Sequence, residues 1–209
     1  MTKNRINHRA LAGIFTLTLL FAGCASVDLE SHVAQSPSQA LELAAKERNT
    51  ETAQRYLLKV ASRFQERDDH RAARTLLQST QLAQPAPSLQ AQKQLLAMAS
   101  AVALEDREWA GGIVTKLSPD NFRGYNSDLV NRAAGLQAET YALVGDRLSA
   151  AMTLMLLSQT DGKVNPQQIH DQIWTFLKAV PDQKLSAAGE NTIGFETEGW
   201  LELAANVRA

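Results

Sequence analysis

A lone cysteine, Cys24, follows the apolar run Leu20-Phe21-Ala22-Gly23 near the start of the chain. A thiol in this setting can carry a diacylglyceryl group through a thioether bond, and cleavage just before it frees an amino group that can be acylated. The small residues Ala22 and Gly23 let a signal peptidase reach the backbone at that point. This pattern is typical of a bacterial lipoprotein and predicts lipidation at Cys24.

The segment before the cysteine predicts export. Lys3, Arg5 and Arg9 precede a 13-residue apolar stretch, residues 10–22, and no acid lies among them. That stretch is well short of the ~20 residues that a membrane-spanning helix needs, so we interpret residues 1–23 as a signal peptide. The alternative is an ordinary secretory signal followed by a buried cysteine. A lone thiol in an exported protein would be reactive, however, and lipidation removes that problem.

Ala25 stands where an Asp would be the usual inner-membrane retention signal in enteric bacteria. Several acyl chains, at ~0.8 kcal/mol per buried CH₂, hold a protein firmly on a bilayer. We therefore expect a lipid-anchored protein on the periplasmic face of the outer membrane. We predict a tether over residues 24–37, in which the thirteen residues after Cys24 reach at most ~40 Å at ~3.3 Å each.

The other side chains with catalytic or metal-binding chemistry form no recognisable site. No G-x-S-x-G nucleophile motif is present, and neither Gly111-Gly112 nor Gly189 and Gly194 make a phosphate loop. Gly111-Gly112 marks either close helix packing or a weakened helix. We expect no enzyme, no metal and no cofactor. The histidines lack metal-site spacing and are expected at the surface or at helix caps: His8, His32, His70 and His170.

The charge balance argues against nucleic acid as a partner. Cleavage before Cys24 removes three of the 21 basic residues and none of the 22 acidic ones, which leaves a net charge of −4. Phosphate binding needs a basic surface.

The body of the chain predicts paired amphipathic helices. Leu57, Val60, Ala61 and Phe64 form one apolar stripe with helical spacing, and residues 72–77 form a second stripe after a polar break at residues 67–69. The pattern recurs at residues 95–102 with 109–117, and at residues 136–143 with 148–156. In the third pair we expect buried positions at Leu148, Ala151, Met152, Met155 and Leu156.

Small residues recur after each turn, at Ala73, Ala110 and Ala150, with spacings of 37 and 40 residues. In the third turn, Gly145 can close one helix with a positive φ, and Asp146 can cap the next. The spacing resembles a tetratricopeptide repeat, whose period is ~34 residues. We therefore predict an all-α fold, a right-handed α-solenoid of irregular tetratricopeptide-like hairpins over residues 38–209. A generic helical bundle is the alternative.

The C-terminal block contains a further set of helices. Asn165-Pro166 is a favourable helix start, and the helix that follows would bury Ile169, Ile173, Leu177 and Val180. After Pro181 we expect a short helix over residues 182–188, a turn at residues 189–191, and a last helix that includes residues 198–204.

Two segments of this block carry a family resemblance. Gln172-Ile173-Trp174-Thr175-Phe176-Leu177, followed by Gly199-Trp200-Leu201-Glu202-Leu203-Ala204, resembles the end of the N-terminal domain of the LpoA family. The lipoprotein pattern, Tyr56-Leu57-Leu58 and the irregular repeats occur in the same order. Members of that family are outer-membrane lipoproteins that activate a class A penicillin-binding protein.

The resemblance implies a non-catalytic regulator of peptidoglycan synthesis with a class A penicillin-binding protein as partner, and peptidoglycan as a second candidate partner. The family's larger C-terminal domain, similar to periplasmic binding proteins, carries the synthase contact. This chain stops at Ala209, where the first domain would end, so we expect that second domain to be absent from it. The alternative function is a tetratricopeptide adaptor lipoprotein for pilus or outer-membrane protein biogenesis.

Six residues are candidates for partner binding. The repeat register places four polar ones on the inner faces of the first helices, where a merely solvated face is the alternative. The other two are tryptophans, for which core packing is the alternative. The six are Arg55, Gln92, Arg132, Glu139, Trp174 and Trp200.

Overall fold

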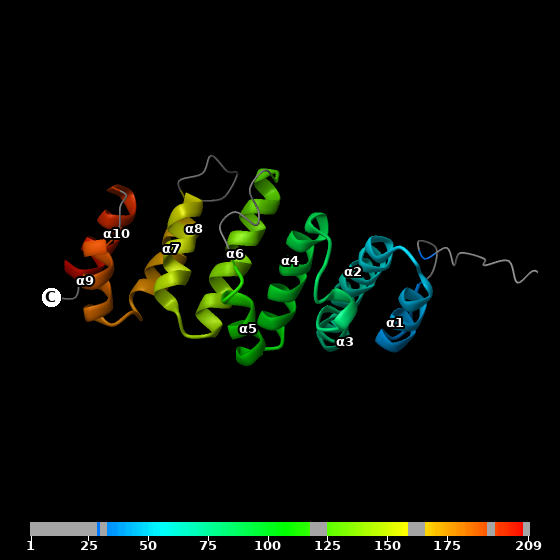
Figure 1. Cartoon of the computed structure of the whole chain (residues 1–209). Coiled ribbons are helices and arrows are strands. Elements are labelled where there is room, and N and C mark those ends of the chain that lie inside the picture. The colour runs from blue at the N-terminus through cyan, green and yellow to red at the C-terminus, as the bar shows by residue number, and fades with distance from the viewer. Residues whose placement is uncertain (1–28, 30–32, 118–124, 159–165, 192–194, 207–209) are drawn as a thin grey trace, which may run out of the picture.

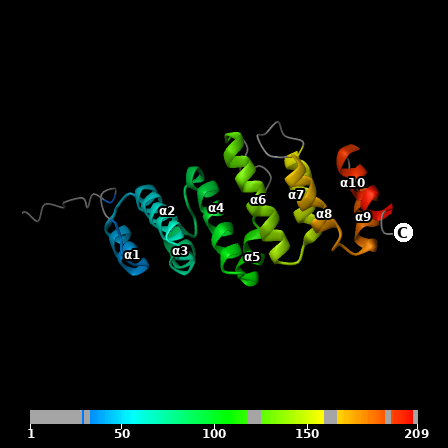
Figure 2. The same cartoon turned by 180° about the vertical axis from the view of Figure 1, so that it is seen from behind.

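The computed structural model describes residue 29 and residues 33–117, 125–158, 166–191 and 195–206, and all regular structure in these residues is helical. The helices stand side by side in one row from α1 at one end to α10 at the other (Figure 1). The view from behind shows the same order (Figure 2). The fold is an all-α solenoid, as predicted.

The helices follow one another with short connections, and one 3₁₀ turn, η1, separates α3 from α4. Their bounds are α1 Pro37–Lys46, α2 Thr50–Glu66, α3 His70–Leu77, η1 Thr80–Leu82, α4 Pro87–Ala103, α5 Arg107–Val114, α6 Ser127–Leu143, α7 Arg147–Ser158, α8 Pro166–Leu177, α9 Asp182–Asn191 and α10 Phe195–Asn206.

The pairs α2–α3, α4–α5 and α6–α7 are hairpins with the same turn. In each turn the residue after the C-cap has a positive φ, 61° at Asp68, 52° at Glu105 and 88° at Gly145. The next residue is an aspartate whose backbone N–H donates to a carbonyl five residues back, at 2.8–3.0 Å. This arrangement is a Schellman motif, which satisfies the last carbonyls of a helix.

The aspartate of each turn also begins the next helix. Asp69, Asp106 and Asp146 each accept a hydrogen bond from the backbone N–H three residues on, at 3.0, 3.0 and 3.1 Å. Such an N-cap satisfies one of the free donors of the first turn. A single aspartate therefore ends one helix through its backbone and starts the next through its side chain, which fixes the hairpin geometry.

The alanines four positions after these aspartates are buried in the core of the hairpins. Ala73, Ala110 and Ala150 are all 0% exposed, which confirms the repeat alignment made from the sequence. Close crossing requires a small side chain, because interiors are packed with few voids.

The predicted stripes are confirmed for most positions. Leu57, Val60, Ala61 and Phe64 are buried in α2, and the stripe of α8 is buried from Ile169 to Val180. In α7, Ala151 and Met155 are buried as expected, Leu148 and Met152 are only partly buried, and the prediction is wrong at Leu156, which is 56% exposed. The buried stripe there falls on Ala150, Ala151, Leu154, Met155 and Leu157.

The N-terminal boundary differs from the extended tether expected over residues 24–37. Leu29 and Ala34 are only 3% and 4% exposed and belong to the core formed with α1, α2 and α3. The open end of a solenoid leaves an apolar surface without a neighbouring repeat, and a terminal segment must cover it. These two apolar side chains contribute to that cover, so at Leu29 and Ala34 the chain is packed on the core and is not an extended tether.

In the C-terminal block, the structure differs from the sequence-based prediction in one place. The prediction of a turn at residues 189–191 is wrong, because α9 continues to Asn191. Gly189 and Asn191 favour turns locally, but such preferences are weak and tertiary context overrides them. The expected helix start at Asn165 lies outside the described residues.

The signal peptide and Cys24 also lie outside the described residues, so lipidation stays a prediction. Within the described part of the chain, no helix has both the length and the apolar character needed to cross a membrane.

Candidate binding surfaces

The four polar candidates lie on the three long helices that begin the hairpins. Arg55 is on α2, Gln92 on α4, and Arg132 and Glu139 on α6, and all four side chains are exposed. Arg55 is already paired with Glu51, one turn away, at 2.8 Å. Exposed pairs of this kind contribute little to stability, so Arg55 can exchange Glu51 for another anion. That these residues bind a partner stays a prediction.

The two tryptophans of the resemblance motifs lie against each other. The ring centroids of Trp174 on α8 and Trp200 on α10 are 6.3 Å apart, with the planes inclined by 54°. Both rings are partly buried against the core shared by α6 to α10. His170 adds a third ring 5.3 Å from Trp200, and the Lys178 ammonium lies 5.8 Å from the Trp174 ring centroid. The two motifs thus form one packing contact, which favours the core interpretation of these tryptophans.

A buried glutamine, which the sequence analysis missed, fixes the connection between the first two hairpins. Gln54 on α2 is 3% exposed. Its amide nitrogen donates to the carbonyls of Gln81 and Gln84, at 3.2 and 2.7 Å, and its carbonyl accepts from the backbone N–H of Ala86 at 2.8 Å. These hydrogen bonds are partly buried, and backbone groups removed from water need such partners. The Gln54 side chain therefore satisfies three backbone groups of the loop before α4.

His70 occupies the junction between the same two hairpins. Its Nδ1 lies 3.4 Å from Ser100 Oγ on α4, and its Nε2 lies 3.4 Å from Asp68. The same Ser100 hydroxyl accepts a hydrogen bond from Gln65 at 2.6 Å. His70 begins α3, as expected of a residue near a cap, but its side chain is only 16% exposed, so it lies at an internal junction. His170 is exposed, whereas His8 and His32 lie outside the described residues.

A cleft, which we call the α4 cleft, opens between α3, α4 and α5. It has a volume of about 470 Å³, within the usual size of small-molecule sites. α4 has 17 residues and α3 and α5 have eight each, so at 1.5 Å per residue they cover about half of its length. The cleft is lined by Leu77, Gln78, Ala83, Gln90, Lys93, Gln94, Ala97, Trp109, Gly112, Ile113 and Lys116.

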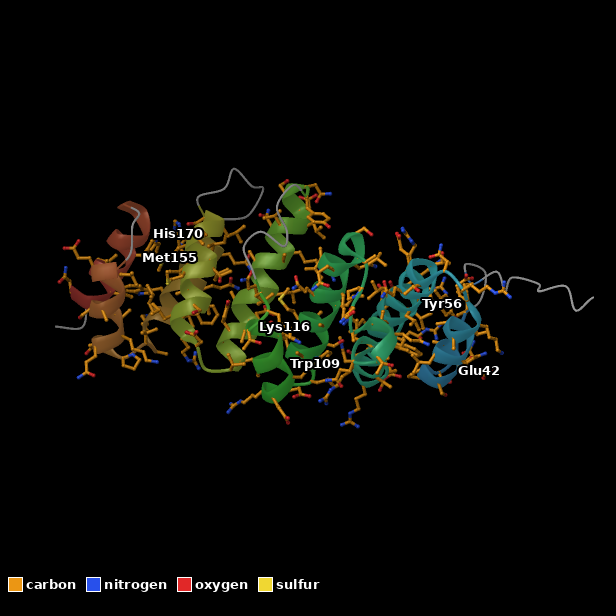
Figure 3. All side chains as sticks on the ribbon, in the orientation of Figure 1. Glu42, Tyr56, Trp109, Lys116, Met155 and His170 are labelled. Carbon is orange, nitrogen blue, oxygen red and sulfur yellow. The ribbon has the colours of Figure 1, made fainter. Side chains whose placement is uncertain are left out.

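The polar groups of the α4 cleft are amides and lysines, and no acidic side chain lines it. Gln94 is 7% exposed, and its carbonyl Oε1 has no hydrogen-bond partner among the described residues. Lys93 donates one hydrogen bond to the Leu82 carbonyl. Burial, and to a smaller extent the charge of Lys116, lower the pKa of Lys93 below its ordinary value. Trp109 lies on α5 and Lys116 just beyond the end of that helix (Figure 3).

Trp109 is held by an ion pair beside the α4 cleft. The Arg74 guanidinium lies 5.4 Å from the indole centroid and pairs with Asp106, the cap of α5, at 2.5 Å. A cation over an aromatic ring is attracted to its face, so this contact restrains the indole. A second cleft, of about 510 Å³, is lined by Arg74 and Asp106 and shares Gln78 with the α4 cleft.

Gly111-Gly112 does not mark close helix packing. A Cβ atom placed on either glycine would meet no heavy atom within 4 Å. The pair therefore weakens α5, since glycine in a helix interior costs roughly 0.5–1 kcal/mol relative to alanine. Among the described residues, no three side chains of the metal-binding types are grouped.

Comparisons with known proteins add a likeness in fold. No protein-family model matches the chain, and no curated protein matches it. A solved structure of LpoA from Haemophilus influenzae is similar, with 16% sequence identity and a TM-score of 0.46. The match is distant. It covers 88% of this chain and 33% of the LpoA chain, so this chain spans about a third of the length of that protein.

Proposed function

We propose that the chain is a non-catalytic lipoprotein of the outer membrane, anchored through Cys24, that regulates peptidoglycan synthesis by contacting a class A penicillin-binding protein. The observation that carries the proposal is the pair of sequence motifs around Trp174 and Trp200. Two segments that resemble one family, separated by more than twenty residues in the chain, pack against each other through their tryptophans.

The architecture suits this role. A solenoid contacts only its nearest neighbours along the row and so forms an extended object with long exposed surfaces. The first helices of its hairpins expose side chains of both signs, Arg132 and Glu139 on α6 among them. Charged groups at an interface give specificity and steer association. An elongated body on a lipid anchor is suited to reach a partner across the periplasm.

Recovery of bound partners tests the proposal. The full-length chain, purified from the solubilised native envelope, should bring down a class A penicillin-binding protein, and Cys24→Ser should lose both fatty-acid labelling and membrane fractionation. Recovery of neither a synthase nor a sacculus fragment would overturn the proposal. Recovery of secretin or barrel-assembly components would favour the adaptor alternative, and release of muropeptides from purified sacculi would contradict a non-catalytic role.

Site-specific photo-crosslinking tests which surface makes the contact. A photoreactive residue in place of Gln92 or Arg132 should form a crosslink to the synthase. The matched control replaces Glu108, which is exposed on the short helix α5. A synthase crosslink from Glu108, with none from the two long helices, would assign the contact to the short second helices of the hairpins and refute the predicted surface.

A further inference from the structure

We propose that a groove formed by α3, α4 and α5 binds an extended peptide segment of a protein partner, with an acidic side chain paired to Arg71 and an apolar side chain against Trp109. The groove consists of two clefts that share Gln78. One is the α4 cleft, and the other, of about 510 Å³, we call the arginine cleft. The inference goes beyond the proposed function and uses none of the six candidate residues of the sequence analysis. The arginine cleft is lined by Arg71, Arg74, Thr75, Gln78, Leu104 and Asp106.

The charge of the arginine cleft is unbalanced at Arg71. Among the described residues that line the cleft, Asp106 is the only acid, and it is already paired with Arg74. Arg71 is exposed, and its guanidinium has no hydrogen bond or ion pair with any described residue. Arg71 lies three residues before Arg74 on α3, so the two cations share a face of the helix, where like charges repel. An anion beside Arg71 offsets this repulsion.

A carboxylate fits the arginine cleft better than a phosphate. A carboxylate accepts two parallel hydrogen bonds from one guanidinium, and its single charge matches the one arginine of the cleft that lacks an anion. A phosphate monoester carries more than one negative charge at neutral pH, and the Asp106 carboxylate in the same cleft would repel it. The favoured anion is therefore the side chain of a Glu or Asp.

Gln78 and Trp109 indicate that this carboxylate belongs to a peptide. Gln78 Oε1 accepts a hydrogen bond from Arg74 Nε at 3.2 Å, whereas the Gln78 amide nitrogen donates to no described residue. That nitrogen can donate to a peptide carbonyl where the two clefts meet. In the α4 cleft, Leu77 and Ile113 are buried, but the indole of Trp109 is only partly buried. An accessible tryptophan favours a protein partner, because this residue is enriched at binding hot spots.

The spacing of the two side-chain contacts fits an extended backbone. The Arg74 guanidinium carbon lies 5.4 Å from the Trp109 ring centroid. Arg71 lies three residues earlier in α3, which is about 4.5 Å along the helix axis at 1.5 Å per residue. In an extended peptide, alternate side chains lie on the same face, about 7 Å apart. A Glu and a Leu two residues apart can therefore reach Arg71 and Trp109 together.

Calorimetry on the full-length chain in detergent tests the groove with the probe acetyl-Ser-Glu-Ser-Leu-Ser-amide, whose blocked ends leave Glu as its only anion. Wild type should bind this peptide, and the probe with Gln in place of Glu should bind about fivefold more weakly, the upper end for an accessible ion pair. The probe with Ser in place of Leu should also bind more weakly. Trp109→Phe should remove the change in fluorescence that accompanies binding.

Arg71→Gln should weaken binding of the Glu probe by about fivefold and should bind the Gln probe as wild type does. Arg147→Gln, which removes another exposed arginine at the start of α7, is the matched control and should bind the Glu probe within about twofold of wild type. Both substitutions are at the surface, so the melting temperatures should stay within about 2 °C of wild type. A folding defect therefore does not imitate the loss of the site.

Four outcomes would overturn the proposal. No binding of the Glu probe by wild type, or equal loss in Arg71→Gln and Arg147→Gln, would refute the site. Tighter binding of the probe with phosphoserine in place of Glu would refute the preference for a carboxylate. Equal binding of free glutarate would refute the peptide. A dimer detected by light scattering that Arg71→Gln dissociates, without binding of the probe, would assign the groove to a second copy of the chain.

Discussion

Two glycine-to-alanine substitutions of opposite expected sign test the hairpin turn. Gly145 has a φ of +88° in the turn between α6 and α7, whereas Gly135 lies inside α6 with ordinary helical geometry. A Cβ atom on either glycine would meet no heavy atom within 4 Å. Steric clashes are therefore absent in both variants, and only the backbone conformation distinguishes them.

The expected magnitudes follow from backbone energetics. An L-residue in the left-handed region costs about 1–2 kcal/mol, offset by about 0.4–1 kcal/mol from the less flexible unfolded chain, so Gly145→Ala should lose about 1 kcal/mol of stability. Gly135→Ala should gain about 0.5–1 kcal/mol, because alanine favours the helix. For a chain of this length, each kcal/mol shifts the melting temperature by about 2–4 °C.

Thermal and urea unfolding, followed by circular dichroism on the full-length variants, measure the difference. Gly145→Ala should melt below wild type and Gly135→Ala above it. If the two variants are stabilised equally, the left-handed residue is not what closes the hairpin, and the account of the three Schellman turns is refuted.

Four further substitutions test the contacts that hold the hairpins. Gln54→Leu should cost about 2–4 kcal/mol in urea unfolding, since it removes three hydrogen bonds from partly buried backbone groups; a cost near zero would show that water replaces the amide. Asp106→Ala should cost about 2 kcal/mol through the loss of both the cap and the Arg74 pair, against about 1 kcal/mol for Asp146→Ala, which removes an exposed cap. Equal melting temperatures for these two would mean that the ion pair contributes nothing. Ala110→Leu should cost about 1–3 kcal/mol by overpacking the crossing of two helices, and a melting temperature at or above wild type would show that the crossing has spare room.

The helical hairpins were predictable because their signals are local. Stripes such as Leu57 to Phe64, the aspartate caps and the small residue after each turn all lie within a few positions of one another. Where a local signal competed with packing, the prediction failed. The turn expected at Gly189 is part of helix α9. Leu156 is exposed because the buried stripe of α7 is shifted by one position from the expected stripe.

The α4 cleft was not predictable in this way. It exists because the short helices α3 and α5 cover only part of the length of α4. Polar residues in the N-terminal half of α4 therefore line an uncovered space. In the sequence, Gln90, Lys93 and Gln94 look like an ordinary solvated stripe. Their burial depends on residues of α3 and α5, and no pattern within α4 reports those distances. The hydrogen bonds from Gln54 to a loop some thirty residues away could not be predicted for the same reason.

The hairpin turns also bear on how the array can change its length. Each turn holds three residues, and its backbone and side-chain bonds leave no room for more. The connections between hairpins, by contrast, run from Gln78 to Ala86 and from Thr115 to Asn126. A duplication that inserts one hairpin at such a connection would extend the row without altering any turn within a hairpin. The reach of such a protein is therefore set by its number of hairpins, and related chains of different span should differ by whole hairpins with their three-residue turns unchanged.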